Sequence, residues 1–308
     1  MALHSTSGRW RFGLFLSATT AILWATLPLA LKVSLGQLDA LTLTWVRFTL
    51  AMVLTGLWQS TRGSLPRLRG QPRRVGWLLA LAALMLIGNY VLYLLGLNFT
   101  TPTNAQVLIQ LAPLLMTLGG VVVFRESFRR WQWFGYAAVV AGLLLFFGDQ
   151  FQAHGGDRFV LGCALIVLAA VVWAIYALAQ KQLLQSFTSQ QVMLVIYTVA
   201  AVLLLPFSHP LALLRLDGLH AIAVLYCAMN TLAAYGAFAE ALAHWEASRV
   251  SMVLALTPLF CAAVVGTSHA FWPELIDAER IALWGWIGAG LVVVGSVAVT
   301  LLHRGRTT

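Results

Sequence analysis

Charge is scarce in this sequence. Only 9% of the 308 residues are Asp, Glu, Lys or Arg, while 60% are hydrophobic; a typical soluble domain has roughly 25% charged residues. A soluble chain of this size would expose far more apolar surface than one core can bury. The composition therefore predicts an integral membrane protein.

Cysteine is also rare, and its placement excludes two kinds of site. The three cysteines, Cys163, Cys227 and Cys261, all fall within apolar runs. Their number is odd and their spacing does not match a metal-ligand pattern, so neither a disulfide framework nor a zinc site is predicted. We expect free, buried thiols that pack as small hydrophobic side chains.

Motifs for catalysis and nucleotide binding are missing as well. The sequence has no phosphate-binding loop, nucleotide motif, metal-ligand quartet or nucleophile elbow. An integral-membrane enzyme should show a cluster of intramembrane His, Asp or Glu, and the apolar runs contain almost none. A membrane sensor or scaffold would need an appended soluble module, and none fits. We therefore expect no cofactor, no metal, no enzymatic activity and no coupling to ATP.

What the sequence has in abundance is long apolar runs, each close to the roughly 20 residues that a helix needs to cross the hydrocarbon layer. The first exceeds a signal-peptide core, so we interpret it as a retained helix. The gaps are too short for a soluble domain. The ten runs are 12–31, 40–59, 75–97, 105–124, 131–148, 159–180, 190–207, 218–239, 250–272 and 281–302.

The basic residues predict an orientation. With a cytoplasmic N-terminus, 14 of the 19 Lys and Arg residues fall in cytoplasmic segments, four fall outside and Arg47 lies within a span. This bias is the positive-inside pattern. It accounts for the net charge of +9 without a nucleic-acid partner. We expect a multi-pass protein of a bacterial inner membrane, with both termini in the cytoplasm.

An internal repeat divides the chain. Trp24 and Lys32 match Trp173 and Lys181 at an offset of 149, and Pro113 matches Pro258 at an offset of 145. The pair Gly135 and Gly142 matches the pair Gly288 and Gly295. Each half, 1–150 and 151–308, holds five spans, so the halves must enter the membrane in opposite directions. The predicted fold is all-α, with ten transmembrane helices in two inverted five-helix repeats around a central cavity.

Several segments together resemble a known family. They are ILWATLPLALK, WVRFTLA and the run TNAQVLIQLAPLLMTLGGVVVFRESFRRWQWFGYAAVVAGLLLFF, followed in the second half by VVWAIYALAQKQL and EASRVSMVLALTPLF. The chain resembles the EamA-like members of the drug/metabolite transporter superfamily over nearly its whole length. The resemblance implies ten helices, a central cavity lined by the first, third, fourth, sixth, eighth and ninth spans, and export of amino acids or related metabolites.

Two departures from the family pattern matter. The second-half segment PELIDAER is longer and more acidic than its counterpart RESFRR. The first span lacks the membrane-embedded carboxylate that small multidrug exporters use for proton exchange, which argues against a cationic-drug pump of that type.

The fourth span carries the main candidate substrate residues. Thr103, Gln106 and Gln110 recur at helical spacing and share a face with Pro113. This polar stripe could meet a zwitterionic substrate, or it could hold helices together through side-chain hydrogen bonds. Pro113, and Pro258 at the matching position, are predicted to bend their helices because proline cannot donate to the helical ladder.

Further candidates come from other spans, either because they are polar or aromatic within an apolar run or because of their repeat position. Cavity lining and packing between helices remain open for each. They are Asn89 and Tyr93 on the third span, Trp24 on the first, Trp173 and Tyr176 on the sixth, and Ser248 and Ser251 on the ninth.

Two charged residues complete the set. Arg47 lies about eight residues into the second span. We favour a structural or gating role for it; snorkelling to the interface and pairing with a carbonyl or a substrate carboxylate are the alternatives. Glu240 flanks the cytoplasmic end of the eighth span, where an interfacial ion pair is favoured over proton binding.

The expected partners are membrane lipid and a small-molecule substrate, an amino acid or similar metabolite. A drug, nucleotide sugar or phosphorylated sugar is the alternative cargo. The sequence leaves open whether the chain acts as a monomer or a homodimer.

Overall fold

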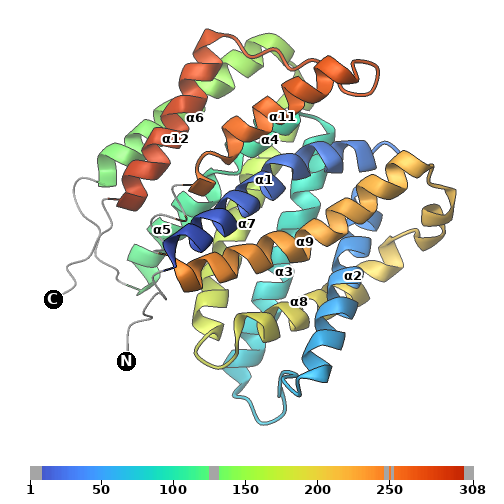
Figure 1. Ribbon diagram of the computed structural model, residues 1–308. Coiled ribbons are helices and arrows are strands. Elements are labelled where there is room, and N and C mark those ends of the chain that lie inside the picture. Colours follow the sequence, from blue (N-terminus) through green and yellow to red (C-terminus); the bar gives the residue numbers. More distant parts are fainter. Residues whose placement is uncertain (1–8, 125–131, 246–249, 251–252, 302–308) are drawn as a thin grey trace.

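The computed structural model describes residues 9–124, 132–245, 250 and 253–301, and within them every regular element is helical. Figure 1 shows the helices packed into one bundle. The elements are α1 Trp10–Ser34, α2 Ala40–Thr61, α3 Arg73–Asn98, α4 Pro102–Leu108, α5 Leu111–Phe124, α6 Gln132–His154, α7 Asp157–Leu183, α8 Ser189–Leu204, the short 3₁₀ turns η1 Leu205–Phe207 and η2 Pro210–Arg215, α9 Gly218–His244, α11 Thr257–Phe271 and α12 Leu283–Leu301.

The helices have the length and composition of membrane spans. Eight stretches are long and apolar enough to cross a membrane, with α4 and α5 counted together as Pro102–Val123. Two shorter apolar helices, Thr257–Phe271 and Leu283–Val299, fall where the ninth and tenth spans are expected. The prediction of an all-helical chain with membrane-spanning segments is confirmed, while the count of ten spans in inverted halves stays a prediction.

Polar side chains define where several helices begin. The Asp39 carboxylate accepts hydrogen bonds from the backbone N–H groups of Leu41 and Thr42 at the start of α2. Thr188 and Gln191 form a reciprocal capping box at the start of α8. Such caps satisfy N–H groups that have no partner within the helix.

The most extensive helix contacts join the first half of the chain to the second. The α1 helix packs on α9, α2 on α8, α3 on α7, and α6 on α12, a pair that lies side by side at one edge of the bundle in Figure 1. Contacts along each pair run in opposite chain directions. On α1 and α9, for example, Gly13 lies against Trp245, and the Asn230 side chain donates to the Leu23 carbonyl at 2.7 Å.

Glycines allow the closest of these approaches. A Cβ atom on Gly142 of α6 would lie 2.6 Å from the Gly288 carbonyl oxygen of α12, and one on Gly295 would lie 2.6 Å from the Gly135 carbonyl oxygen. The two repeat-matched glycine pairs therefore face each other. Small residues that bring backbones together are a common device for helix association in membranes.

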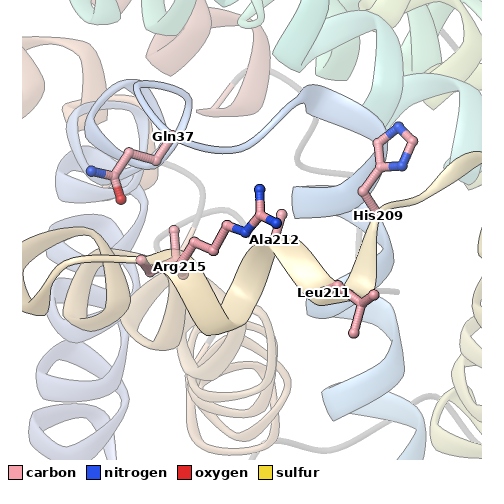
Figure 2. A pocket seen from close by; sticks show the side chains of 6 residues that line it. Gln37, His209, Leu211, Ala212 and Arg215 are labelled. Carbon is pink, nitrogen blue, oxygen red and sulfur yellow. The ribbon is translucent and has the colours of Figure 1, made fainter.

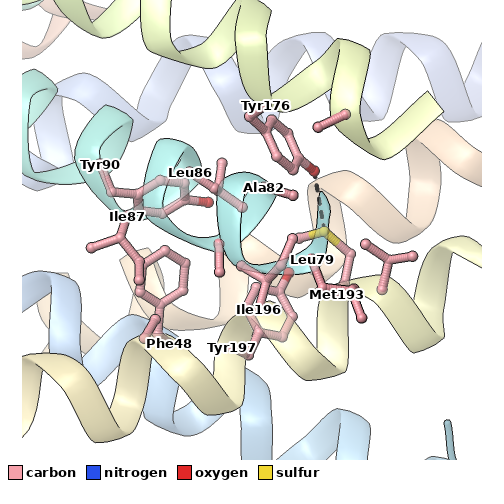
Figure 3. Packing of buried hydrophobic residues seen from close by; sticks show 14 of the residues in the cluster. Phe48, Leu79, Ala82, Leu86, Ile87, Tyr90, Tyr176, Met193, Ile196 and Tyr197 are labelled. Carbon is pink, nitrogen blue, oxygen red and sulfur yellow. Dashed lines mark hydrogen bonds between the residues drawn. The ribbon is translucent and has the colours of Figure 1, made fainter. Parts of the chain in front are cut away.

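The largest apolar cluster lies between α2, α3, α7 and α8. Figure 3 shows Phe48 beside Tyr90, with ring centroids 4.5 Å apart, and Ile196 and Tyr197 approaching from α8. This cluster borders the polar and aromatic residues described next.

Candidate functional site

Aromatic side chains from four helices meet inside the bundle. Trp24 of α1 lies 5.7 Å from Tyr235 of α9 between ring centroids. Tyr235 also lies near Tyr90 on α3 and Trp173 on α7. Tyr90 and Tyr235 occupy matching repeat positions, at the same offset of 145 as the two prolines. We call Trp24, Tyr90, Trp173 and Tyr235 the aromatic group.

Three members of the aromatic group are not fully packed. Tyr90 is buried, whereas Trp24, Trp173 and Tyr235 are only partly buried although each lies between helices. Tyr93, one turn along α3 from Tyr90, is likewise partly buried. The side chains at this convergence of helices thus retain accessible surface.

Arg47 of α2 lies against the aromatic group. Its side chain is 4% exposed, its Nε donates to the Thr231 hydroxyl of α9 at 3.2 Å, and its guanidinium carbon is 4.6 Å from the centroid of the Tyr90 ring. Tyr93, Tyr197 and Tyr235 also lie near this charge. The side chain therefore points into the bundle.

The helix that carries the predicted polar stripe is interrupted at the stripe. The α4 helix ends at Leu108 and α5 begins at Leu111, which leaves Gln110 in the interruption and Pro113 in the first turn of α5. The Gln106 side chain is buried in α4, and its amide makes no hydrogen bond to the part of the chain that the structure describes. Through the interruption the backbone turns more tightly: the Gln110 N–H donates to the Val107 carbonyl at 3.2 Å and the Ala112 N–H to the Ile109 carbonyl at 2.9 Å, in place of bonds to the carbonyls four residues back.

The second half has an interruption at the matching place. Residues 255 and 256 form a turn, after which α11 begins at Thr257 with Pro258 as its second residue. The α11 helix packs against α4. Ser248 and Ser251, predicted for this region, lie outside the described residues, so their role stays a prediction.

A polar cluster closes one end of α4. The backbone N–H of Thr103 donates to the Glu279 carboxylate at 3.1 Å, and Thr103 itself is buried. Near them, the Lys32 ammonium donates to the carbonyls of Leu97 at 2.7 Å and Thr100 at 3.0 Å, at the end of α3. The Glu279 contact thereby ties the segment between α11 and α12 to the start of α4, and the Lys32 contacts tie α1 to the end of α3.

Two candidates make packing contacts. The Asn89 amide donates to the Ala169 carbonyl of α7 at 2.9 Å. The Tyr176 hydroxyl donates to the Met193 sulfur of α8 at 3.2 Å, drawn as a dashed line in Figure 3. Both contacts are those expected of side chains that hold helices together, and contact with a substrate remains a prediction for both.

Glu240 lies at the end of α9 and is 58% exposed, with its carboxylate 3.0 Å from His244 Nε2. This is a local contact between neighbouring turns at the helix end. Among the described residues, no group of three or more His, Cys, Asp or Glu side chains could hold a metal ion.

A separate pocket lies near the ends of the helices. It has a volume of about 510 Å³ and lies between the α1–α2 turn and η2, where Gln37 and Arg215 line it together with His209 (Figure 2). No residue of the aromatic group lines this pocket.

Sequence reasoning found Trp24, Trp173 and Arg47 but missed Tyr90 and Tyr235. The repeat offset of 145 that relates the two prolines also relates these tyrosines. That shared offset was the available signal.

The comparisons with known proteins agree with the helical architecture. The profile of the EamA-like transporter family matches residues 11–148 and again 160–301. A solved structure with a TM-score of 0.62 and 22% identity covers 96% of this chain and 99% of that chain. At this identity the structural likeness concerns the fold alone.

Curated relatives cover nearly the full chain. A protein of Haemophilus influenzae named "Uncharacterized transporter" is 34% identical over 293 residues, which cover 95% of each chain. The Escherichia coli "Uncharacterized inner membrane transporter YhbE" is 34% identical over 95% of this chain and 92% of its own. An Escherichia coli "Probable amino-acid metabolite efflux pump" is 24% identical over 91% of this chain and 92% of its own.

Proposed function

Because this chain belongs to the EamA-like transporter family and is a membrane transporter, we propose that it exports amino acids or related small metabolites. Transport would proceed by alternating access and without ATP. The pair of interrupted helices carries this proposal. Transporter substrate sites are typically built at discontinuous helices, because their interruptions present unpaired backbone groups inside the membrane.

The two interruptions occupy equivalent places. They lie at Ile109–Gln110 and Ala255–Leu256, just before the repeat-matched prolines, and the helices that carry them contact each other. The antiparallel pairing of helices across the two halves supports the proposal that 1–150 and 151–308 are inverted repeats about this point.

The surrounding side chains favour an amphipathic cargo. Aromatic rings of the aromatic group offer apolar and cation-binding faces, and Gln106 and Gln110 offer hydrogen-bonding groups close to the interruption. The name of the Escherichia coli relative as an amino-acid metabolite efflux pump points to the same class of substrate.

Transport by the purified protein in liposomes tests this proposal. We would measure counterflow of radiolabelled amino acids, with a phosphorylated sugar and a cationic dye as rival cargoes. Gln106→Ala and Gln110→Ala should each reduce amino-acid flux, whereas Gln152→Ala, at the exposed end of α6, should not. Unchanged flux in both variants would show that the α4–α5 interruption is not part of the substrate site. Transport of a rival cargo alone would refute amino acids as the substrate class.

We further propose a bacterial inner-membrane location with both termini cytoplasmic, in keeping with the basic-residue bias and with relatives named as inner membrane transporters. Cysteines introduced as Ser5→Cys and Gly305→Cys should both resist a membrane-impermeant thiol reagent added to intact spheroplasts and react after lysis. The native cysteines are buried, so they give a low background. Labelling of one position in intact spheroplasts would refute this orientation.

A further inference from the structure

We infer that Arg47 binds a carboxylate group of the transported molecule, so that a carboxylate is a requirement for transport. This inference rests on the proposed function and narrows it to a chemical class. The favoured interpretation from sequence was a structural or gating role, and the surroundings of the side chain argue for direct contact instead.

Arg47 is a buried charge without a counter-ion. It is 4% exposed, and no Asp or Glu oxygen lies within 4 Å of its guanidinium nitrogens in the described part of the chain. An unpaired charge held away from water is strongly unfavourable. Ionisable residues that are kept within membrane spans therefore mark sites where charge is used.

The guanidinium also has hydrogen-bonding capacity to spare. Of its five N–H donors, the Nε donor goes to Thr231, and the guanidinium carbon lies over the Tyr90 ring. Within the described chain the two Nη groups have no hydrogen-bond acceptor. Neither is among the buried polar atoms that lack a partner, so both keep some accessible surface. The two outer nitrogens of a guanidinium match the geometry of a carboxylate, which they bind through two parallel hydrogen bonds.

The surroundings argue against the other two roles. A snorkelling arginine would extend toward the interface, whereas Arg47 contacts Thr231 and Tyr90 inside the bundle. A purely structural arginine would use its donors on backbone carbonyls, as Lys32 does at the end of α3. Arg47 makes no such bond in the described residues.

The neighbouring side chains describe the rest of the ligand. Trp24, Trp173 and Tyr235, all partly buried, lie near Tyr90 and supply further aromatic rings. Such rings accept an ammonium group or an apolar side chain. None of these four residues is acidic, so aromatic rings would hold a positive group of the ligand, and its carboxylate would form the only full ion pair, with Arg47.

Binding to the purified wild-type protein gives the first test. Aliphatic and aromatic L-amino acids, and phenylacetate, would be compared with their carboxamides by thermal shift and by tryptophan fluorescence. At least one carboxylate should raise the melting temperature, with its carboxamide at least about tenfold weaker, because a hydrogen-bonded charge pair is lost. Equal binding of acid and amide, or no binding by any carboxylate, would overturn the inference.

Variants give the second test. Arg47→Gln should weaken carboxylate binding at least about tenfold and leave the weak amide binding unchanged, whereas Arg47→Lys should restore part of the carboxylate preference. Thr231→Val should have a smaller effect. If Arg47→Gln does not fold, Arg47→Lys and the comparison of carboxylates with carboxamides on the wild-type protein decide whether Arg47 binds the carboxylate. Retained preference in a folded Arg47→Gln protein would overturn the inference.

The outcome is separable from that of the proposed function. Arg47-dependent binding of phenylacetate without amino-acid flux would contradict the proposed cargo and support the carboxylate site. Flux of amino acids and their amides at equal rates would support the proposed transport and contradict the site.

Discussion

Replacement of Gly288 by alanine should loosen the α6–α12 pair, while the same change two residues away should not. A Cβ atom at Gly288 would lie 2.6 Å from both the Gly142 carbonyl oxygen and the Phe146 backbone nitrogen. At Gly290 on the same helix, nothing lies within 4 Å. The two substitutions add one methyl group in the same helix, so they differ only in what that group meets.

The magnitude follows from the contacts. Ordinary contact begins near 3.4 Å, and the obstructing atoms are backbone, so the two helix axes must separate by several tenths of an ångström. Overpacking of this kind costs about 1–3 kcal/mol. Alanine gains about 0.5–1 kcal/mol over glycine within a helix, but this gain is common to both variants and cancels in their difference.

Thermal denaturation of both purified variants in one detergent measures the difference. We expect Gly290→Ala to melt at or slightly above the wild-type temperature, and Gly288→Ala to melt clearly below it. A domain of this size shifts by about 2–4 °C per kcal/mol. Equal melting temperatures, or a more stable Gly288→Ala, would refute the close backbone approach of α6 and α12.

Three further predictions concern the ends of helices. Lys32→Met should lower the stability by about 1–3 kcal/mol because carbonyls at the end of α3 lose their donor, measured by thermal denaturation against wild type. Thr188→Ala should cost about 1 kcal/mol through loss of the α8 cap, with Thr188→Ser close to wild type in the same assay. Hydrogen bonds from His220 lower the pKa of Asp217 below its ordinary value of 3.8. Its contribution to stability is therefore complete above that value and is lost as the pH falls through the lowered pKa. Asp217→Asn should reduce this loss of stability at low pH, seen when the melting temperature is measured as a function of pH. An unchanged loss would argue against a contribution from Asp217.

Hydropathy was sufficient to predict the helical class and most span positions, because about 20 consecutive apolar residues have few other uses. It did not predict that the fourth span divides at Ile109–Gln110, although Pro113 marked the region. A proline shows where the ladder is weakened, but whether the helix bends or stops depends on the helices packed against it.

The candidate site was predicted less completely. The repeat identified Trp24, Trp173 and the four glycines as equivalent positions, but equivalence does not reveal contact. That Gly142 meets Gly288, or that Arg47 meets Thr231 at a separation of 184 residues, depends on which helices pair across the halves. Arg47 was visible as an anomaly, and its surroundings had to come from the structure.

The pairing of nearly every helix with one from the other half has a consequence for biogenesis. When the first five segments have left the ribosome, Asn89 has no Ala169 carbonyl to bond, and Gly142 has no opposing backbone to approach. The first half would remain in the lipid with these helix faces unpaired until the second half has been synthesised. Assembly would then be a late, chain-wide event, and damage near the C-terminus would expose the first half to membrane proteases as readily as damage within it.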